Sequence, residues 1–262
     1  MGFLFAFYPI FKGGFKGISF NPLFLLISFF TLMFSYVFLP IVWFFVARSF
    51  GIPITFKESV VSWYVSSIGR YIPGKVWQFA GRVSSLNHPA GKVVSAMVYE
   101  HLVLMLSAAM FSFIYTRYPF IQGFTFLILL LITIIWGYSV KFLQRFNPNL
   151  SYAPKNAKLV FLSVLFSTIY WIFSSLSAYF VSLSLFSNYG YRYIAFVFSF
   201  SFVASYVLPL TPAGLGIREG IISALMGYNI QSSTFSILTR LVITAVDIAM
   251  LIFALIYNRF AK

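Results

Sequence analysis

The fold is decided by two polar segments, IGRYIPGKV at residues 68–76 and LPLTPAGLGIREG at residues 208–220. Each contains proline and glycine, which interrupt helices, and each carries arginine within apolar surroundings. On both sides of each break the chain is apolar for about 15 residues, which as a helix spans roughly 22 Å against roughly 30 Å of bilayer hydrocarbon. Residues 57–87 and 193–226 are therefore each predicted to form a helix–break–helix hairpin that enters the membrane and returns.

The composition is that of a membrane protein. Of 262 residues, 61% are hydrophobic and 8% are charged, whereas about 25% are charged in an ordinary soluble domain. No polar stretch is long enough to fold as a separate soluble core, so residues 1–262 are predicted to form a single transmembrane domain. Residues 1–19 lack the order of a cleaved signal peptide and are expected to be an interfacial lead-in.

Five stretches are long and apolar enough to span a bilayer. Residues 20–46, 120–140 and 159–186 contain no charge. Residues 93–116 and 232–257 carry ionisable groups at mid-depth, namely Glu100 in the first and Arg240 with Asp247 in the second. Such residues usually face a protein interior or a watery cavity.

The order of these segments predicts an inverted repeat. Residues 20–116 read as span, hairpin, span, and residues 159–258 read the same way, with residues 120–140 as a linking span. Each unit would end on the side where it began, so the single linking span would start the second unit from the opposite face. The predicted class is an all-α, polytopic membrane protein with the inverted-repeat plan of many transporters.

The charge balance predicts both partner and orientation. Eighteen Lys and Arg face four Asp and Glu, which on a membrane scaffold favours anionic lipid headgroups rather than nucleic acid. With the N-terminus outside, nine basic residues fall in cytoplasmic loops and four in outer loops, so the C-terminus is expected in the cytoplasm. The nine are Arg48, Lys57, Lys92, Lys141, Arg145, Lys155, Lys158, Arg259 and Lys262; the four are Lys12, Lys16, Arg117 and Arg192. The absence of cysteine and the presence of only two histidines argue against a metal site, and no cofactor is expected.

The first hairpin carries a basic helical face. Lys75, Gln78 and Arg82 lie at i, i+3 and i+7 after the Pro73-Gly74 break, and Arg70 precedes it. A helix N-terminus with arginine nearby is suited to a phosphate group. Alternatively, Lys75 and Arg82 snorkel to the membrane surface and only anchor the hairpin.

The second hairpin breaks at Pro209 and Pro212 and continues through Gly214 and Gly216. Arg218 and Glu219 follow within one turn; they are candidate ligand-binding residues or neutralise each other or partners such as Asp247. In the last span Arg240, Thr244 and Asp247 share one face. Arg240 and Asp247 either reach into the cavity as binding residues or find partners elsewhere in the bundle. Within the apolar layer Glu100 needs a basic partner or a bound proton. Its alternative role is therefore a structural salt bridge. Glu100 and Asp247 are also candidates for proton coupling. His101 is expected to pack rather than to bind a ligand.

These motifs resemble the lysylphosphatidylglycerol synthase transmembrane, or flippase-like, family. The resemblance rests on residues 68–76 with Arg82 and the later YEHL at 99–102, and on residues 208–220 with LTRL at 238–241. It implies a membrane domain that moves lipid between leaflets, with these site candidates: Arg70, Pro73, Gly74, Lys75, Glu100, Gly214, Gly216, Arg218, Glu219 and Arg240. The family's soluble aminoacyl-transferring domain is missing, Ala213 replaces a usual glycine and His101 a common arginine, so synthase activity is not expected.

Three functions follow as hypotheses. The first is a flippase or transporter for an anionic phospholipid or a polyprenyl-phosphate-linked lipid, in the plasma (inner) membrane of a prokaryote. The second is a membrane-embedded transferase with Glu100, Glu219 or Asp247 as base, although four acidic residues leave little room for that chemistry. The third is a non-catalytic accessory subunit of a lipid- or glycan-synthesis enzyme. A second copy of the chain is a further candidate partner.

Overall fold

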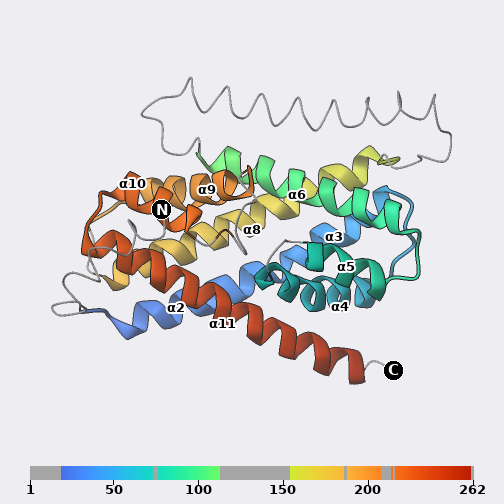
Figure 1. The fold of residues 1–262 in the computed structure, drawn as a ribbon, viewed down its shortest axis with the longest axis horizontal. Helices are drawn as coiled ribbons and strands as arrows, with labels where there is room; N and C mark the ends of the chain where they lie inside the picture. Colours follow the sequence, from blue (N-terminus) through green and yellow to red (C-terminus); the bar gives the residue numbers. More distant parts are fainter. Residues whose placement is uncertain are drawn as a thin grey trace.

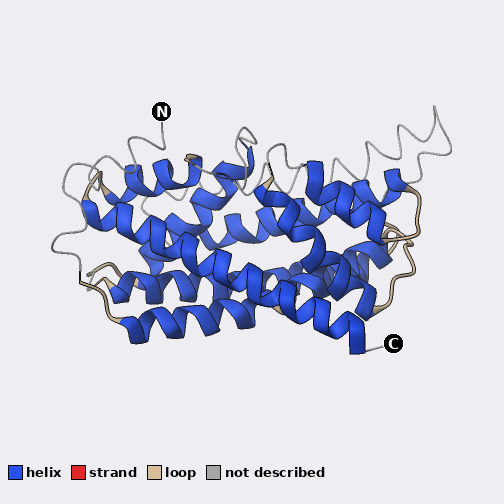
Figure 2. Cartoon of the chain, turned by 60° about the horizontal axis from the view of Figure 1, so that its bottom comes forward, coloured by secondary structure: helices blue, strands red, loops and turns tan. Residues whose placement is uncertain are grey.

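A computed structural model describes residues 19–72, 76–112, 154–185, 188–207, 214 and 216–260. This part of the chain is helical and contains no strand (Figure 2). The elements are α2 (Pro22–Tyr36), α3 (Phe38–Ser49), α4 (Phe56–Ser67), the short 3-10 helix η1 (Ile68–Tyr71), α5 (Val76–Ser85), α6 (Ala90–Ser112), α8 (Ala157–Ser184), α9 (Tyr191–Val207), α10 (Ile217–Met226) and α11 (Ile230–Phe260).

Four of the described helices are long and apolar enough to cross a membrane. They are Pro22–Ser49, formed by α2 and α3 together, and α6, α8 and α11, with lengths of 28, 23, 28 and 31 residues. Four of the five predicted spans are therefore confirmed as helices of sufficient length. The fifth, residues 120–140, lies outside the described residues, as do residues 1–18 of the lead-in.

The junction of α2 and α3 is caused by a proline. Pro40 has no N–H to donate to the carbonyl of Tyr36, four residues earlier. That carbonyl instead accepts a hydrogen bond from the Tyr64 hydroxyl at 3.0 Å, and the Pro40 carbonyl accepts one from the Ser59 hydroxyl at 2.6 Å. The irregular turn of the first span thus holds α4 in place.

The two predicted hairpin regions are antiparallel helix pairs, α4 with α5 and the 17-residue α9 with α10. In the first, the Arg82 Nε of α5 donates to the Ser66 hydroxyl of α4 at 3.1 Å. In the second, the Tyr193 hydroxyl of α9 donates to the Leu225 carbonyl of α10 at 2.5 Å. The helices α4 and α5 have 12 and 10 residues, roughly 18 and 15 Å, so neither alone reaches across the hydrocarbon. The breaks at residues 73–75, 208–213 and 215 are outside the described residues.

The described limbs of the two hairpins run from opposite ends of an elongated bundle, and their tips, the ends of the limbs next to the breaks, lie near its middle (Figure 1). At one end, Lys92 Nζ donates to the Gly51 carbonyl at 2.6 Å, next to the start of α4 and the end of α5. At the other end, the Asn21 amide donates to the Ser184 carbonyl at 2.8 Å. There the Tyr189 hydroxyl also reaches the Met226 carbonyl at 3.3 Å. The tips of the two hairpins therefore approach each other from opposite ends of the bundle.

Small polar residues lie between the long helices, and large apolar residues lie outside. Ser28 of α2 and Ser177 of α8 share a hydrogen bond of 2.8 Å between their hydroxyls, which allows the two helices to approach closely. Large side chains such as Phe161, Leu241 and Ile252 are 67%, 59% and 50% exposed. An exterior of this kind is suited to lipid rather than water.

Candidate functional site

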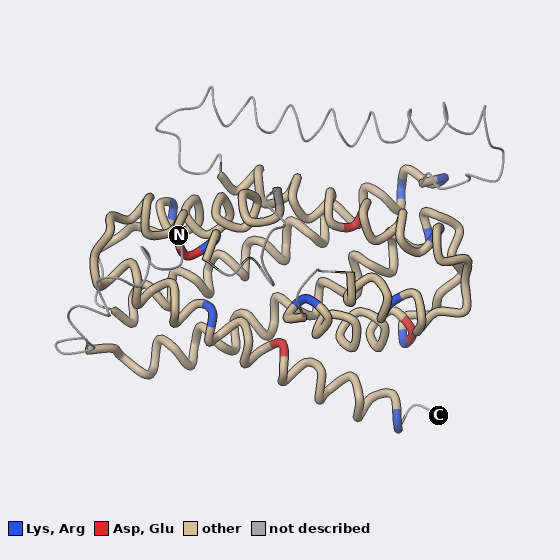
Figure 3. The backbone as a smooth tube through the Cα atoms, in the orientation of Figure 1, with Lys and Arg blue, Asp and Glu red and all other residues tan. Residues whose placement is uncertain are grey.

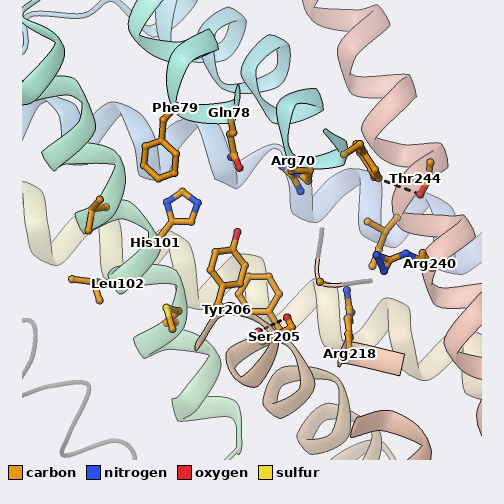
Figure 4. Close-up of a pocket in the computed structure, with 16 residues that line it drawn as sticks. Arg70, Gln78, Phe79, His101, Leu102, Ser205, Tyr206, Arg218, Arg240 and Thr244 are labelled. Carbon is orange, nitrogen blue, oxygen red and sulfur yellow. Dashed lines mark hydrogen bonds between the residues drawn. The ribbon is translucent and has the colours of Figure 1, made fainter. Parts of the chain in front are cut away.

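A cavity of about 280 Å³ lies where the tips of the two hairpins meet α6 and α11 (Figure 4). Both hairpins therefore contribute to one site, although their sequences lie more than a hundred residues apart. The polar lining residues are Arg70, Tyr71, Gln78, His101, Ser205, Tyr206, Gly214, Arg218, Arg240 and Thr244. The apolar lining residues are Phe79, Val98, Leu102, Met105, Phe202 and Ile243.

Arg70 is held at the tip of the first hairpin by the 3-10 turn. Its Nε donates to the Ser67 carbonyl at 2.9 Å, and its guanidinium carbon lies 5.4 Å from the centre of the Trp63 ring. One terminal nitrogen lies 3.8 Å from Oδ1 of Asp247 on α11, at the outer limit of an ion pair. The Arg70 side chain is 23% exposed, so this loosely held cation is accessible from the cavity.

Asp247 joins the first hairpin to the last helix. Its Oδ2 accepts a hydrogen bond of 2.5 Å from the Tyr71 hydroxyl, which also lies 3.4 Å from the Thr244 hydroxyl. The carboxylate is 3% exposed and lies behind the cavity wall. It acts as the counter-charge of Arg70 rather than as a lining group.

Glu219 connects the second hairpin to the same helix. One carboxylate oxygen accepts the backbone N–H of Gly216 at 2.7 Å, as in a capping box, which stabilises the first turn of α10. The other oxygen accepts from an Arg240 terminal nitrogen at 2.7 Å. Arg240 thus lines the cavity, and the carboxylate of Glu219 balances its charge.

Arg218 differs from its neighbours because no carboxylate remains for it. The chain has four acidic residues, and all four are described. Glu58 caps α4 through Thr55, and the three others form the ion pairs with Arg70, Arg82 and Arg240. The Arg218 guanidinium lies 4.6 Å from the centre of the Phe198 ring, and one buried terminal nitrogen has no hydrogen-bond partner among the described residues. Among the described residues at the cavity, three arginines therefore stand against the two carboxylates of Asp247 and Glu219, which leaves one positive charge without an ion pair.

Arg82 and Glu100 pair with each other away from the cavity. Arg82 is 0% exposed and Glu100 1% exposed; the pair is completed by Trp63 Nε1, which donates to Glu100 at 2.7 Å, and by the ring of Trp43, 4.5 Å from the guanidinium. Both residues were predicted to bind substrate, but neither lines the cavity. Complete burial also excludes a snorkelling role for Arg82. Their geometry is that of the structural salt bridge considered for Glu100, and it fixes α5 to α6.

The cavity has a neutral, aromatic side opposite the arginines. The ring of His101 stacks on Phe79 with centroids 5.8 Å apart and lies 5.4 Å from the ring of Tyr206. Its Nδ1 lies 2.6 Å from the Met97 carbonyl. Because a carbonyl only accepts, Nδ1 carries the hydrogen. The predicted packing role of His101 is therefore accompanied by a position in the cavity wall.

Of the sequence-predicted site residues, Arg70, Gln78, Gly214, Arg218 and Arg240 line the cavity. Glu219 and Asp247 lie behind it as ion-pair partners, and Gly216 precedes α10 as its N-cap. Lys75, Pro73, Gly74, Pro209 and Pro212 lie outside the described residues. Sequence reasoning missed Tyr71, Phe79, Ser205 and Tyr206; the only available signal was that Tyr71, Ser205 and Tyr206 are close to a break. Among the described residues no group of three or more His, Asp or Glu is placed to hold a metal ion.

No family model matches the chain, and no curated protein is significantly similar to it. The resemblance to the lysylphosphatidylglycerol synthase transmembrane family therefore stays a prediction from the motifs.

Proposed function

We propose that this protein binds the phosphate headgroup of an anionic lipid in the cavity between its two hairpins and moves the lipid between leaflets, as a flippase-like transporter. The observation that carries this proposal is the uncompensated Arg218 in a cavity wall that also holds Arg70 and Arg240. An unpaired cation at such a depth is costly, and an anionic ligand removes the cost.

The chemistry of the wall favours phosphate. Guanidinium groups bind two phosphate oxygens at once, and Arg218 lies one residue into α10, at the positive end of that helix. Arg70 adds a second cation whose tie to Asp247, at 3.8 Å, is loose. Phosphate oxygens can therefore be shared between the two hairpins.

The size of the cavity favours a headgroup rather than a whole lipid. At about 280 Å³ it lies just below the roughly 300–1,000 Å³ of pockets for drug-sized ligands. The tails would remain in the bilayer against the apolar exterior. A protein that carries a polar headgroup through an apolar layer needs this arrangement, with the headgroup in the cavity and the tails in the bilayer.

An inverted repeat of re-entrant hairpins is part of the proposal. In this repeat α2–α3 corresponds to α8, α4 to α9, α5 to α10 and α6 to α11. The packing contacts between helices correspond in the same way. For example, α6 packs against α9 as α11 packs against α4, and α3 packs against α4 as α8 packs against α9. In both units the second limb of the hairpin is also ion-paired to the next long helix, as Arg82–Glu100 and as Glu219–Arg240 with the charges reversed. Alternating access by motion of one unit against the other is consistent with this plan.

The proposed orientation places the C-terminus in the cytoplasm, here assigned to a prokaryotic plasma membrane. Lys and Arg gather at the bundle end where α11 finishes (Figure 3). At this end Lys92 Nζ donates to the Gly51 carbonyl, and the Lys155 amide donates to the Ser49 carbonyl. This asymmetry agrees with the positive-inside rule.

The transferase alternative is less well supported. Glu100, Glu219 and Asp247 are its candidate bases, and each is already hydrogen-bonded within an ion pair. No described observation favours the accessory-subunit alternative over transport.

Reconstitution tests the proposal. In vesicles with a trace of tail-labelled anionic phospholipid, the protein is expected to accelerate transfer of the label between leaflets relative to protein-free vesicles. The recovered lipid should have an unchanged mass. A chemically altered lipid would instead support the transferase, and unchanged transfer would refute lipid movement.

A further inference from the structure

The cavity has two chemically different ends, and this difference specifies the headgroup. Arg70, Arg218 and Arg240 lie together at one end, and Phe79 and His101 lie at the other, with Gln78 and Tyr206 between them (Figure 4). A ligand that fills both ends must carry its charge at one end only.

The arginine end is suited to a single negative charge. Within the described part of the chain, its three guanidinium groups face two carboxylates, those of Asp247 and Glu219, which leaves a surplus of one positive charge. A phosphodiester carries one negative charge and balances that surplus. A phosphomonoester or a headgroup with an additional carboxylate brings more negative charge than the wall compensates.

The opposite end offers hydrogen bonds without charge. The Nδ1–H of His101 donates to the Met97 carbonyl. A second ring proton would add a fourth cation to a cavity whose carboxylates already serve arginines. With the ring neutral, its Nε2 accepts hydrogen bonds. Gln78, whose amide both donates and accepts, also faces the cavity. Hydroxyl groups match this set, and the Phe79 and Tyr206 rings provide flat apolar surface beside it.

An amine headgroup does not match. An ammonium would add a fourth cation, and the carboxylates of Asp247, Glu219 and Glu100 already serve Arg70, Arg240 and Arg82. Like charges in an apolar layer repel strongly.

We infer that the lipid handled here is a phosphodiester whose headgroup beyond the phosphate is neutral and rich in hydroxyl groups, such as a glycerol or a sugar. This inference rests on the proposed anionic-lipid site. The same headgroup chemistry occurs in phosphatidylglycerol and in polyprenyl-phosphoryl hexoses, which differ in their tails.

Native mass spectrometry of the full chain tests this selectivity. The purified protein is equilibrated with equimolar phosphatidylglycerol, phosphatidylethanolamine, phosphatidylserine and phosphatidic acid, and separately with a polyprenyl-phosphoryl hexose competing against phosphatidylglycerol. Phosphatidylglycerol should be retained about fivefold to tenfold over the other three, as expected for one well-formed hydrogen bond or more. Whichever lipid prevails in the second mixture identifies the tails.

Two variants connect the selectivity to the neutral end. His101→Phe keeps the ring stack and removes the acceptor, and Gln78→Leu removes the amide; each should lower the preference for phosphatidylglycerol over phosphatidic acid about fivefold. His88→Phe, outside the cavity, is the matched control and should change nothing. If all the anionic lipids are retained equally, the inferred headgroup selectivity is wrong, but an anionic-lipid site still stands. If phosphatidylethanolamine is retained as well as phosphatidylglycerol, the site is not selective for anionic lipids. Retention of no lipid overturns both the inference and the proposed function.

Discussion

At the residue scale, two arginines differ in burial and in their partners: Arg82 is fully buried, and Arg218 is half-buried. Arg82 and Arg218 both lie against aromatic rings, at 4.5 Å from Trp43 and 4.6 Å from Phe198. Arg82 has a carboxylate and Arg218 has none. The Arg82 side chain has its counter-charge within the chain, although one of its terminal nitrogens, like one of Arg218, has no hydrogen-bond partner among the described residues. In the proposed function an anion supplies the counter-charge of Arg218.

Replacing Glu100 should therefore damage stability. Glu100→Gln leaves the fully buried Arg82 without its counter-charge, and breaking a buried ion pair costs about 3–5 kcal/mol. The expected result is a lower unfolding temperature in detergent, measured by intrinsic tryptophan fluorescence. Glu58→Gln serves as the control, because glutamine can still complete the capping box of α4. An unchanged unfolding temperature for Glu100→Gln would contradict the structural role.

The sequence allowed the arginines near the breaks to be chosen, but not their partners. Tyr71 and Asp247 meet across 176 residues, and no local spacing rule reaches that far. Which arginine stays unpaired depends on how three carboxylates are shared out in the folded bundle. The aromatic residues of the cavity wall could not be predicted either. Because 22% of the residues in the chain are aromatic, the sequence does not distinguish Phe79 or Tyr206 from the others.

At the element scale, both hairpins close on a glycine. A Cβ on Gly69 would lie 2.4 Å from the backbone nitrogen of Gln78, on the opposite limb. Gly214 has φ of 71°, and a Cβ there would approach the Cβ of Ser205 to 3.1 Å. The broken segments could be predicted as hairpins because proline and glycine mark them locally, whereas the close packing of the limbs follows only from the folded backbone.

Gly69→Ala should open the first hairpin. Backbone atoms cannot move aside as a side chain would, so the cost should reach or exceed the roughly 1–3 kcal/mol typical of overpacking. Thermal unfolding of the purified variant measures this. Gly190→Ala is the matched control, since a Cβ there meets no atom within 4 Å. Similar unfolding temperatures for the two variants would show that the limbs are not held in this close contact.

At the scale of the whole molecule, the two hairpins open toward opposite ends of the bundle, which the proposed inverted repeat places on opposite sides of the membrane. The chain has no cysteine, so a single introduced thiol reports its own side. Asn87 and Gly190 are exposed and lie at the open ends of the first and second hairpin.

A membrane-impermeant maleimide should label Gly190→Cys in intact cells and Asn87→Cys only after permeabilisation. The expectation follows from the proposed orientation, in which the basic end of the bundle is cytoplasmic. Labelling is measured by the mass shift of the purified protein. Labelling of both thiols from the same side would refute the inverted arrangement.

Lipid transfer by one variant tests the central claim most directly. Arg218→Met removes the uncompensated cation and should slow leaflet exchange of phosphatidylglycerol in reconstituted vesicles by about tenfold or more, the loss expected for a charge-assisted hydrogen bond. Arg192→Met, which removes an exposed arginine from the same hairpin, should exchange the lipid at the wild-type rate. Equal rates for wild-type protein and Arg218→Met would contradict an anionic headgroup held between the hairpins.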